Sequence, residues 1–506
     1  MALQAFSQEV ETEKTYEISR KSKRGFLAGI DFDKDAKTYQ LTYITKQTER
    51  KLKYEFYKFD NDFNFLADGE GEEKFETMKT KFTWFKFKDL YYAVEGVTVE
   101  NNLTGTLVLK RKRTNYTYDF YSGGYKRVVT VAEKLKPKND DGRSLTLVTY
   151  AEDDKTGDVL VLAGVKSKKK SETNTRPNDL ILFRFNKDLD IVAQTTVPFE
   201  QWQAFAGAKI LYEKNEEDPE NPGVASISVV FYTSTDRKGK PTYTYLKLGA
   251  DTKINQRFTF DGLSSFWKID EFIYDYDKGD MYVFGPSSDE QNKFTAGKYS
   301  AVELLKVNNG GTKDYFTQTK IEEFSAKLKT PPTQKKSPEY SGKKFEFSNY
   351  KVASNGDLFV SGQNFKIDAS GKDQGTKNFK DIMGFHFSDK GVLKAQYGVD
   401  TKENGKEAND NGTPQEFIEG RDGNMFWLLR EIKDYNANYN KLLTYPRLAK
   451  VTPDATITDF LTLGKSEGYY LDPKYPYLET DKGNRLVFFG ANKSGKSLWF
   501  CKVKLN

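Results

Sequence analysis

The sequence of 506 residues contains a single cysteine, Cys501, and a single histidine, His386. One cysteine excludes an intramolecular disulfide and any metal site built from several cysteines. One histidine excludes zinc and iron centres that need several imidazoles, and it leaves at most one imidazole for acid–base chemistry. These two shortages disfavour most hydrolase and metalloenzyme classes.

Long apolar runs and helical patterns are also scarce. No stretch is long and apolar enough for a transmembrane helix, so no membrane span is expected. The chain has 79 Lys and Arg against 73 Asp and Glu, and this net charge of +6 is too small for its length to indicate a nucleic-acid partner. Aromatic residues, in contrast, make up 15% of the chain, which is enough ring surface to fill a large folded core.

Two kinds of short segment recur in alternation along the chain. The first is a polar turn with a glycine, followed by an apolar run, as in Gly157-Asp158 before 159–164 and Gly279-Asp280 before 281–285. Uninterrupted apolar runs of this length are typical of strands that are buried on both faces. Three further copies follow Gly356, Gly423 and Gly483.

The second segment alternates apolar and polar residues and then ends in a polar turn, which is the pattern of an antiparallel hairpin. Strands of this kind end near residues 59, 109, 185, 248, 307, 387, 451 and 503. A unit of about 50 to 80 residues with four short strands is typical of a β-propeller blade. We therefore predict an all-β protein whose residues 13–506 form a single β-propeller of eight blades, with seven as the alternative because 87–150 is the least regular segment.

The two ends of the chain are predicted to share one blade. The last unit ends with the strand 497–506, and no outer strand follows it. The N-terminal segment 14–19 can supply that strand, which closes the propeller and removes an exposed sheet edge.

Few segments break this pattern of strands. One helical turn is predicted at 320–328. Polar insertions are expected to project from a rim as loops, where binding residues usually lie. These insertions are 165–178, 212–223, 365–379 and 400–414.

Residues 1–12 are predicted to be the tail of a signal peptide or a disordered N-terminus. Ala5 and Ser7 occupy the −3 and −1 positions of a cleavage site of the A-x-A kind, with Gln8 as the new first residue. We therefore expect an exported protein of the periplasm or the outer membrane.

Two motifs resemble ligand-binding loops. The segment 490–497 matches the P-loop pattern G-x-x-x-x-G-K-[ST], but a P-loop needs a helix after it, and the residues that follow alternate like a strand. The segment Asp31–Asp35 begins like an EF-hand loop, but Ala36 replaces the required glycine and Thr42 the final glutamate. We expect hairpin turns at both places. Ca²⁺ on a blade turn is kept as an alternative, and no other cofactor is expected.

No catalytic, cofactor-binding or metal-binding residue is assigned. His386 has no partner motif and is expected to be packed or at the surface rather than a general base. The acidic pairs Asp153/Asp154 and Asp275/Asp277 lie in turns, and sequence proximity does not place a carboxylate pair in a shared cleft.

Basic clusters and a group of tyrosines are two further candidates for binding surfaces. The basic clusters 21–24, 110–113 and 166–170 are predicted to be solvated loops. A group of C-terminal tyrosines is expected mostly to pack between blades, with a sugar- or protein-binding surface as the alternative. These are Tyr435, Tyr439, Tyr469, Tyr470, Tyr475 and Tyr477.

The repeated units of turn and strand resemble bacterial β-propellers of the exported, envelope type. The chain lacks the G-H…W-D marks of WD40 repeats and the repeated Gly-Gly of kelch repeats, which occurs only at Gly123-Gly124 and Gly310-Gly311. By size and composition it is similar to a propeller subunit associated with the type 9 secretion translocon of Gram-negative bacteria.

This resemblance implies a scaffold rather than an enzyme. The expected function is non-catalytic binding of a protein partner, as an accessory subunit of an envelope complex. The alternative is an extracytoplasmic propeller that binds or acts on glycans. The sequence assigns no residues to the partner-binding surface.

Overall fold

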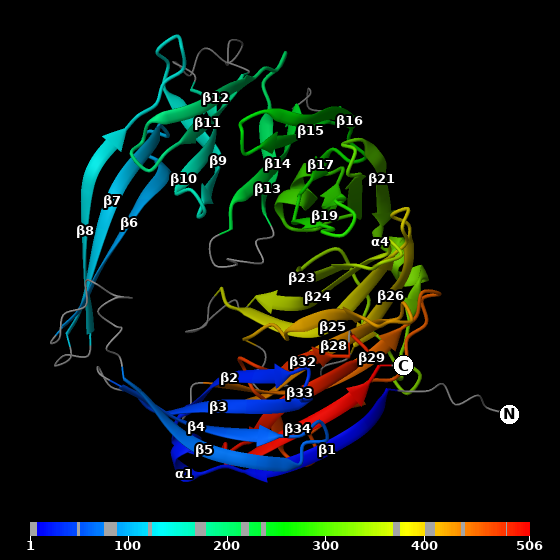
Figure 1. Cartoon of the computed structure of the whole chain (residues 1–506). Coiled ribbons are helices and arrows are strands. Elements are labelled where there is room, and N and C mark those ends of the chain that lie inside the picture. The colour runs from blue at the N-terminus through cyan, green and yellow to red at the C-terminus, as the bar shows by residue number, and fades with distance from the viewer. Residues whose placement is uncertain are drawn as a thin grey trace. The chain divides into compact units, whose positions relative to one another are not determined.

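The computed structural model describes residues 8–47, 51–74, 89–119, 124–166, 179–213, 222–233, 239–367, 375–399, 410–436, 441–481 and 483–505. The chain divides into two compact units. Unit 1 consists of residues 1–75, 292–305 and 315–506, and unit 2 of residues 76–291 and 306–314. Strands dominate both units (Figure 1).

Unit 1 contains four sheets whose strands are joined mainly in antiparallel pairs. The first has the order β2 (Phe26–Asp33), β3 (Thr38–Gln47), β4 (Lys51–Phe59), β5 (Phe65–Lys74). The second has the order β23 (Phe345–Val352), β24 (Leu358–Ile367), β25 (Lys377–Phe387), β26 (Leu393–Val399), with β22 (Leu328–Lys329) added in parallel to β26. The third has the order β27 (Gln415–Glu419), β28 (Met425–Asn436), β29 (Lys441–Val451), β30 (Leu461–Thr462).

The fourth sheet of unit 1 is built from both ends of the chain. It comprises β31 (Tyr469–Leu471), β32 (Tyr477–Thr480), β33 (Arg485–Asn492), β34 (Ser497–Lys504) and β1 (Glu9–Glu17). Strand β1 pairs antiparallel with β34 from Glu9↔Lys504 to Glu17↔Ser497 (Figure 1). The indole N–H of Trp499 also donates a 2.6 Å hydrogen bond to Glu13. The predicted blade shared by the N- and C-terminal strands is therefore confirmed.

Unit 2 contains three complete sheets. They are β6 (Asp89–Asn101), β7 (Leu107–Asp119), β8 (Gly124–Leu135); β9 (Leu145–Asp153), β10 (Asp158–Val165), β11 (Leu180–Phe185), β12 (Ile191–Val197); and β13 (Ala204–Tyr212), β14 (Val224–Thr233), β15 (Thr242–Gly249), β16 (Ile254–Asp261). Strands β17 (Phe266–Trp267) and β18 (Glu271–Tyr274) both pair with β19 (Met281–Ser288). Strands β20 (Ala301–Val307) and β21 (Lys313–Lys320) lie where the division between the units crosses the chain.

The described helices are short. They are α1 (Arg20–Arg24), α3 (Gln291–Thr295) and α4 (Ile321–Ala326), and α4 confirms the helix predicted at 320–328. None of the helices among the described residues has the length and apolar character needed to cross a membrane.

One five-residue turn recurs after the third strand of a sheet. In each copy the first residue exchanges backbone hydrogen bonds with the fourth and fifth, as in Asn186 with Leu189 and Asp190. The fourth residue has a positive φ, between 60° and 83°, which produces a hairpin with a bulge. The fourth residues are Phe63, Leu189, Thr252, Gly311, Gly391 and Ala455.

Most strand predictions agree with this architecture. Seven of the eight predicted alternating strands end as expected, in β4, β11, β15, β20, β25, β29 and β34, and the predicted apolar runs are β10, β19, β24, β28 and β33. The strand expected to end near residue 109 instead begins there, because β7 runs from Leu107 to Asp119. The irregular segment 87–150 holds the three-stranded sheet β6–β8. Successive four-stranded antiparallel sheets, with one sheet made by both chain ends, identify the fold as a β-propeller. The number of blades and the domain limits 13–506 stay predictions.

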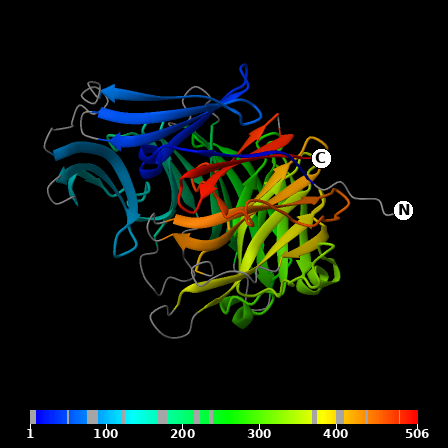
Figure 2. The same ribbon diagram turned by 90° about the horizontal axis from the view of Figure 1, so that it is seen from below.

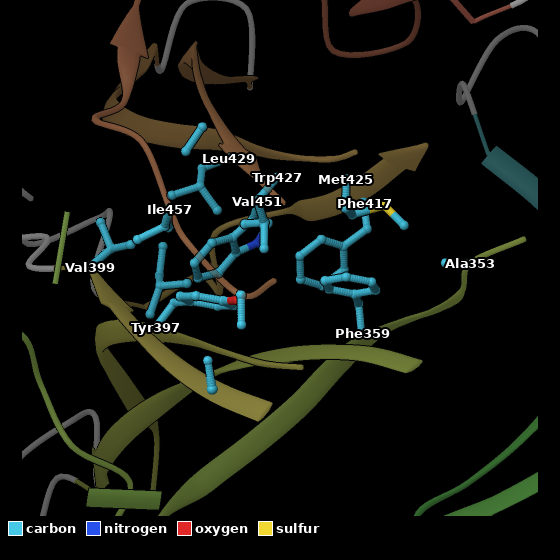
Figure 3. Packing of buried hydrophobic residues seen from close by; sticks show 14 residues of the cluster. Ala353, Phe359, Tyr397, Val399, Phe417, Met425, Trp427, Leu429, Val451 and Ile457 are labelled. Atoms are coloured by element: carbon cyan, nitrogen blue, oxygen red, sulfur yellow. The ribbon is translucent and has the colours of Figure 1, made fainter. Parts of the chain in front are cut away.

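The sheets of unit 1 pack face to face in series. One apolar cluster joins the sheet β2–β5 to β33 and β34, and a second joins β33 and β34 to β28 and β29. Figure 2 shows the backbones of these blue, red and orange strands one after another. A third joins the sheet β23–β26 to the sheet β27–β30, with Trp427 at its centre (Figure 3). The Trp427 indole stacks on Phe417 with ring centres 5.6 Å apart.

Candidate binding site

An irregularity in the β24–β25 hairpin shapes a large pocket in unit 1. The strand register changes from Gln363↔Ile382 to Phe365↔Phe379. This leaves Asn364 without a register partner in β25, and a bulge of this kind redirects the side chains around it. Asn364 lines a pocket of about 870 Å³ in unit 1.

The loop before β23 forms another wall of this pocket. The backbones of Lys298 and Lys343 make an isolated antiparallel bridge, and the N–H of Tyr299 donates a 2.6 Å hydrogen bond to the carbonyl of Gly342. Gly342 has a φ of +70°, and a Cβ there would lie 2.3 Å from the Tyr299 carbonyl oxygen. Only glycine therefore allows the loop to bring these lysines to the pocket.

The pocket is strongly basic, and we call it the lysine pocket. Five lysines line it against two acidic residues, Glu339 and Asp381. The lysines are Lys298, Lys343, Lys344, Lys366 and Lys380. The first four are exposed, and in the described part of the chain none of them pairs with a carboxylate. An unpaired group of ammonium ions favours an anionic ligand.

The floor of the lysine pocket is apolar. It includes Tyr340, which is buried, and the half-buried ring of Phe345, whose centre lies 5.1 Å from that of Tyr340. The amide oxygen of Asn364 is buried and has no hydrogen-bond partner among the described residues, although its nitrogen donates to Asp381 at 3.4 Å. Such an acceptor can receive an N–H or O–H group of a ligand. The pocket can therefore hold a group with an anionic part and an apolar part.

The single histidine lies elsewhere, inside the sheet β23–β26. His386 is fully buried, and its ring stacks on Phe359 with centres 4.2 Å apart. Its Nε2–H donates to Asp357 at 2.8 Å, and its Nδ1 accepts the hydroxyl of Tyr397 at 3.3 Å. With both ring nitrogens engaged and no exposed surface, His386 is a packed residue, as predicted, and has no access to a substrate.

Similar pairs of a carboxylate and a basic side chain recur in other sheets and explain the role of His386. Arg184 donates to Asp158 at 2.7 Å, and Lys306 lies 3.1 Å from Asp280. In each of these sheets, as for Asp357 and His386, the carboxylate follows a turn glycine and the basic side chain lies on the next strand. The recurrence indicates a structural tie within the blade rather than a catalytic group.

Long cationic side chains also connect neighbouring sheets through hydrogen bonds. Arg184 donates a 3.1 Å hydrogen bond to the carbonyl of Ala250, in the recurring turn of the next sheet. Lys394 donates to Pro453 and Lys502 to Asn61, which occupy the same second position of that turn. Each bond satisfies a turn carbonyl where two sheets meet.

We expect the stability of the fold to fall on acidification through this network. Burial lowers the pKa of His386 more than Asp357 raises it, so the unfolded chain binds a proton first as pH falls below about 6.5. Burial alone would raise the pKa of Asp357, but hydrogen bonds from His386 and Lys394 lower it to about 2. Asp357 therefore contributes about 2 kcal/mol to the free energy of unfolding, and this contribution is lost as the pH falls from about 4 to about 2.

Urea unfolding at pH 7.5 and pH 5 tests the first step. Because the chain has one histidine, no other imidazole titrates in this range. In the variant His386→Phe, the free energy of unfolding should differ much less between the two pH values than it does in the unaltered chain. An unchanged difference would show that another group is responsible.

The two loop motifs are hairpin turns, as predicted. The P-loop-like segment 490–497 joins β33 to β34, and the side-chain oxygen of Asn492 accepts from the backbone of Lys496 at 3.1 Å. In the EF-hand-like segment, Asp33 accepts from the backbone of Asp35 and of Ala36. The described residues contain no group of three His, Cys, Asp or Glu side chains placed to hold a metal ion. Ca²⁺ on a blade turn stays an untested prediction.

The acidic pairs also stabilise the turns in which they lie, because their carboxylates accept backbone hydrogen bonds there. Asp275 accepts from the backbone of Asp277 at 3.0 Å, and Asp153 accepts from Thr156 at 3.1 Å. Asp153 and Asp154 do line a pocket of about 430 Å³ in unit 2. Asp153 lies 3.7 Å from Arg184, so part of this acidic charge is already neutralised.

The basic clusters are only partly in loops. Lys21 belongs to α1 and pairs with Glu70 at 3.0 Å. The cluster 110–113 lies within β7 instead of a loop, and there Arg111 bonds to Asp188 at 2.7 Å. Lys166 donates to Thr106 at 3.3 Å, and the rest of that cluster lies outside the described residues.

The C-terminal tyrosines that the structure describes are partly buried. Tyr469 stacks on Trp499 with centres 6.1 Å apart, and Tyr477 packs against Phe488 at 6.2 Å. Tyr475 donates its hydroxyl to the carbonyl of Ala28. Tyr439 lies outside the described residues. This agrees with the expected packing role for most of them.

Sequence reasoning did not identify the lysine pocket. Its lysines span residues 298 to 380, and only Lys343 and Lys344 are adjacent, whereas the sequence analysis considered contiguous clusters. Phe365, Lys366 and Ile367, which were predicted to belong to the loop 365–379, line the pocket from the end of strand β24. Large parts of all four predicted insertions, namely 167–178, 214–221, 368–374 and 400–409, lie outside the described residues.

Comparisons with known proteins give no family for this chain. No protein-family model matches it, and no curated protein matches. Solved structures match at low similarity: an α-L-arabinanase of Penicillium chrysogenum (9% identity, 69% of this chain and 90% of that chain, TM-score 0.27), a lignostilbene dioxygenase of Pseudomonas brassicacearum (11%, 88% and 90%, 0.28) and a mutant apocarotenoid oxygenase of Synechocystis (10%, 80% and 88%, 0.31). Identities and TM-scores this low carry no argument about activity.

Proposed function

We propose that this chain is a non-catalytic binding protein of the β-propeller class, which holds an acidic segment of a protein partner in the lysine pocket. The observation that carries the proposal is the composition of that pocket. Four exposed lysines, none paired with a carboxylate among the described residues, line the pocket together with aromatic rings. Aspartate and glutamate side chains match the lysines, and an aromatic or aliphatic neighbour in the same segment matches the floor.

The rigidity of the pocket supports binding rather than catalysis. The floor belongs to a network of edge-to-face rings in which Tyr340 contacts Phe345, Phe347 and Phe385. The only imidazole of the chain is fully buried in a structural network. A preformed pocket loses little entropy when a partner segment binds.

We further propose that the partner belongs to a bacterial envelope complex, such as the type 9 secretion translocon, and that the protein is exported to the periplasm or outer membrane. The single cysteine and the repeated propeller units support this placement, because the chain resembles exported envelope propellers in its composition and in its repeats. A photo-cross-linking amino acid at position 366, followed by mass spectrometry of cross-linked native cells, would identify the partner.

A charge-reversal pair tests the lysine pocket directly. The double variant Lys343→Glu/Lys366→Glu is expected to weaken binding of a fluorescent Glu-rich peptide with one phenylalanine by about tenfold or more, because two attractions become repulsions. Fluorescence anisotropy at low salt measures this, and the affinity of the unaltered chain should fall as salt is added.

The matched control is Lys335→Glu/Lys336→Glu, two exposed lysines of the same unit that do not line the pocket. It changes the net charge equally and should bind almost normally. Equal losses in both double variants would mean that only overall charge attracts the peptide. A preference for a uronate oligosaccharide over the peptide would favour the glycan-binding alternative.

A further inference from the structure

A second pocket lies on the other face of the β23 edge. Along β23, Phe345 lines the lysine pocket, whereas Glu346 and Ser348 line a cavity of about 370 Å³. No described residue lines both pockets. The alternation of side chains along a strand separates them. We call the smaller cavity the amide pocket, because Gln363 and Gln415 line it.

The amide pocket has a built wall. The Gln363 side chain is 3% exposed and bridges two segments. Its amide nitrogen donates to the carbonyl of Lys380 at 2.6 Å, and its amide oxygen accepts from the backbone N–H of Thr413 at 2.9 Å. This bridge holds the segment before β27 against β25. The pocket is therefore shaped by a buried polar contact and not by chance at the surface.

Several polar atoms of this wall lack partners. The hydroxyl of Thr413, a residue 4% exposed, is buried and makes no hydrogen bond within the described structure. Both polar atoms of the Gln415 side-chain amide are buried and equally unpartnered there. Each buried polar group left unpaired costs about 1 to 3 kcal/mol, so three such atoms in one pocket need an explanation.

The charges of the pocket limit what can satisfy these atoms. Among the described residues that line it, Glu346 is the only charged one, and Lys377 already pairs with it. An ion would therefore gain no net attraction. The unpartnered atoms include a donor and an acceptor in one amide and a hydroxyl that can serve as either. Phe379, half-buried, adds an apolar ring surface beside them.

We propose that the amide pocket binds a neutral saccharide, a single sugar residue or the end of a glycan chain. The Gln415 amide pairs with two hydroxyls of the sugar, Thr413 bonds a third, and the C–H face of the ring packs on Phe379. A cavity of about 370 Å³ lies within the range of small-ligand pockets. This site is independent of the protein-binding role proposed for the lysine pocket.

Thr413→Val tests the saccharide site, because valine keeps the shape and removes the hydroxyl. The probe is a panel of glucose, galactose, mannose, N-acetylglucosamine and their disaccharides, screened with the full chain by saturation-transfer NMR and titrated by calorimetry. We expect at least one sugar to bind and Thr413→Val to weaken that binding about tenfold or more. Gln415→Leu should do the same.

A stability measurement separates this role from a structural one. Without sugar, Thr413→Val should unfold at the same or a higher temperature, because it removes an unpaired buried group. A marked loss of stability would assign the hydroxyl to the fold and overturn the proposal. So would sugar binding that Thr413→Val leaves unchanged, or no binding of any sugar in the panel.

The lysine-pocket variant distinguishes the two proposals. Lys343→Glu/Lys366→Glu should bind the sugar normally, since it alters no residue of the amide pocket. Loss of peptide binding with sugar binding retained would therefore leave the saccharide site intact. If the unaltered chain binds the peptide but no sugar, the saccharide proposal fails while the proposed protein-binding function stands.

Discussion

Replacing Asp357 by alanine is expected to lower the free energy of unfolding by about 3 to 5 kcal/mol at pH 7. Asp357 is 4% exposed and accepts hydrogen bonds from His386 at 2.8 Å and from Lys394 at 3.1 Å. It also accepts from the backbone N–H of Asp389 at 3.0 Å. The substitution leaves a half-buried ammonium ion, a buried imidazole and a turn N–H without their shared acceptor.

The measurement is urea unfolding followed by fluorescence, with Asp389→Ala as the matched control. Asp389 lies in the same turn, but its side chain is half exposed and pairs only loosely with Lys390, at 3.6 Å. The control should therefore cost about 0.5 kcal/mol or less. In the double variant Asp357→Leu/His386→Phe, part of the lost stability should return, because an apolar pair replaces the buried polar pair. A loss below about 1 kcal/mol for Asp357→Ala would contradict this account of the network.

Replacing Trp427 by alanine is expected to cost about 3 to 5 kcal/mol. The indole is fully buried at the centre of the cluster that joins the sheets β23–β26 and β27–β30 (Figure 3). Strand β25 approaches it so closely at Gly384 that a Cβ there would lie 3.0 Å from the ring. Two sheets that already meet this closely cannot collapse far enough to fill the space that the ring leaves.

Trp427→Phe is the informative control for this prediction. The indole N–H is buried and has no hydrogen-bond partner among the described residues, so its loss carries no penalty. We expect phenylalanine to cost about 1 to 2 kcal/mol, well below the alanine variant, in the same urea experiment. Equal costs for both variants would mean that the indole nitrogen, and not the ring volume, stabilises the cluster.

The hairpins were predictable because local chemistry determines them. The run of apolar residues after Gly157 needs a strand with both faces buried, and β10 is that strand. The recurring turn was identified from its polar residues, although phenylalanine, leucine, threonine and alanine occupy the left-handed position in four copies. The pairing of β1 with β34 followed from counting strands, because the last sheet needs a fourth strand and the N-terminal segment has the pattern to supply it.

Neither pocket was predictable in this way. Asn364 reaches the lysine pocket because the β24–β25 register changes beside it, and no residue type in that hairpin marks the change. Lys298 and Lys343 meet through one backbone bridge although 44 residues lie between them in the sequence. The unpartnered atoms of Thr413 and Gln415 are visible only once every neighbour is placed. His386 could be expected to be packed, because no partner motif accompanies it in the sequence. Its hydrogen bond to Asp357 could not be predicted, because it depends on how two strands are placed in the fold.

The sequence by itself therefore determined the all-β class, the positions of the repeated strands and the joining of the two chain ends. These features depend on backbone angles and on side-chain alternation, which act over a few residues at a time. Only the tertiary structure decided which lysines share a pocket, which polar atoms lack partners and which acid holds the histidine. Those properties depend on distances of a few ångströms between strands far apart in the sequence, and hydrogen bonds and ion pairs lose their strength beyond such distances.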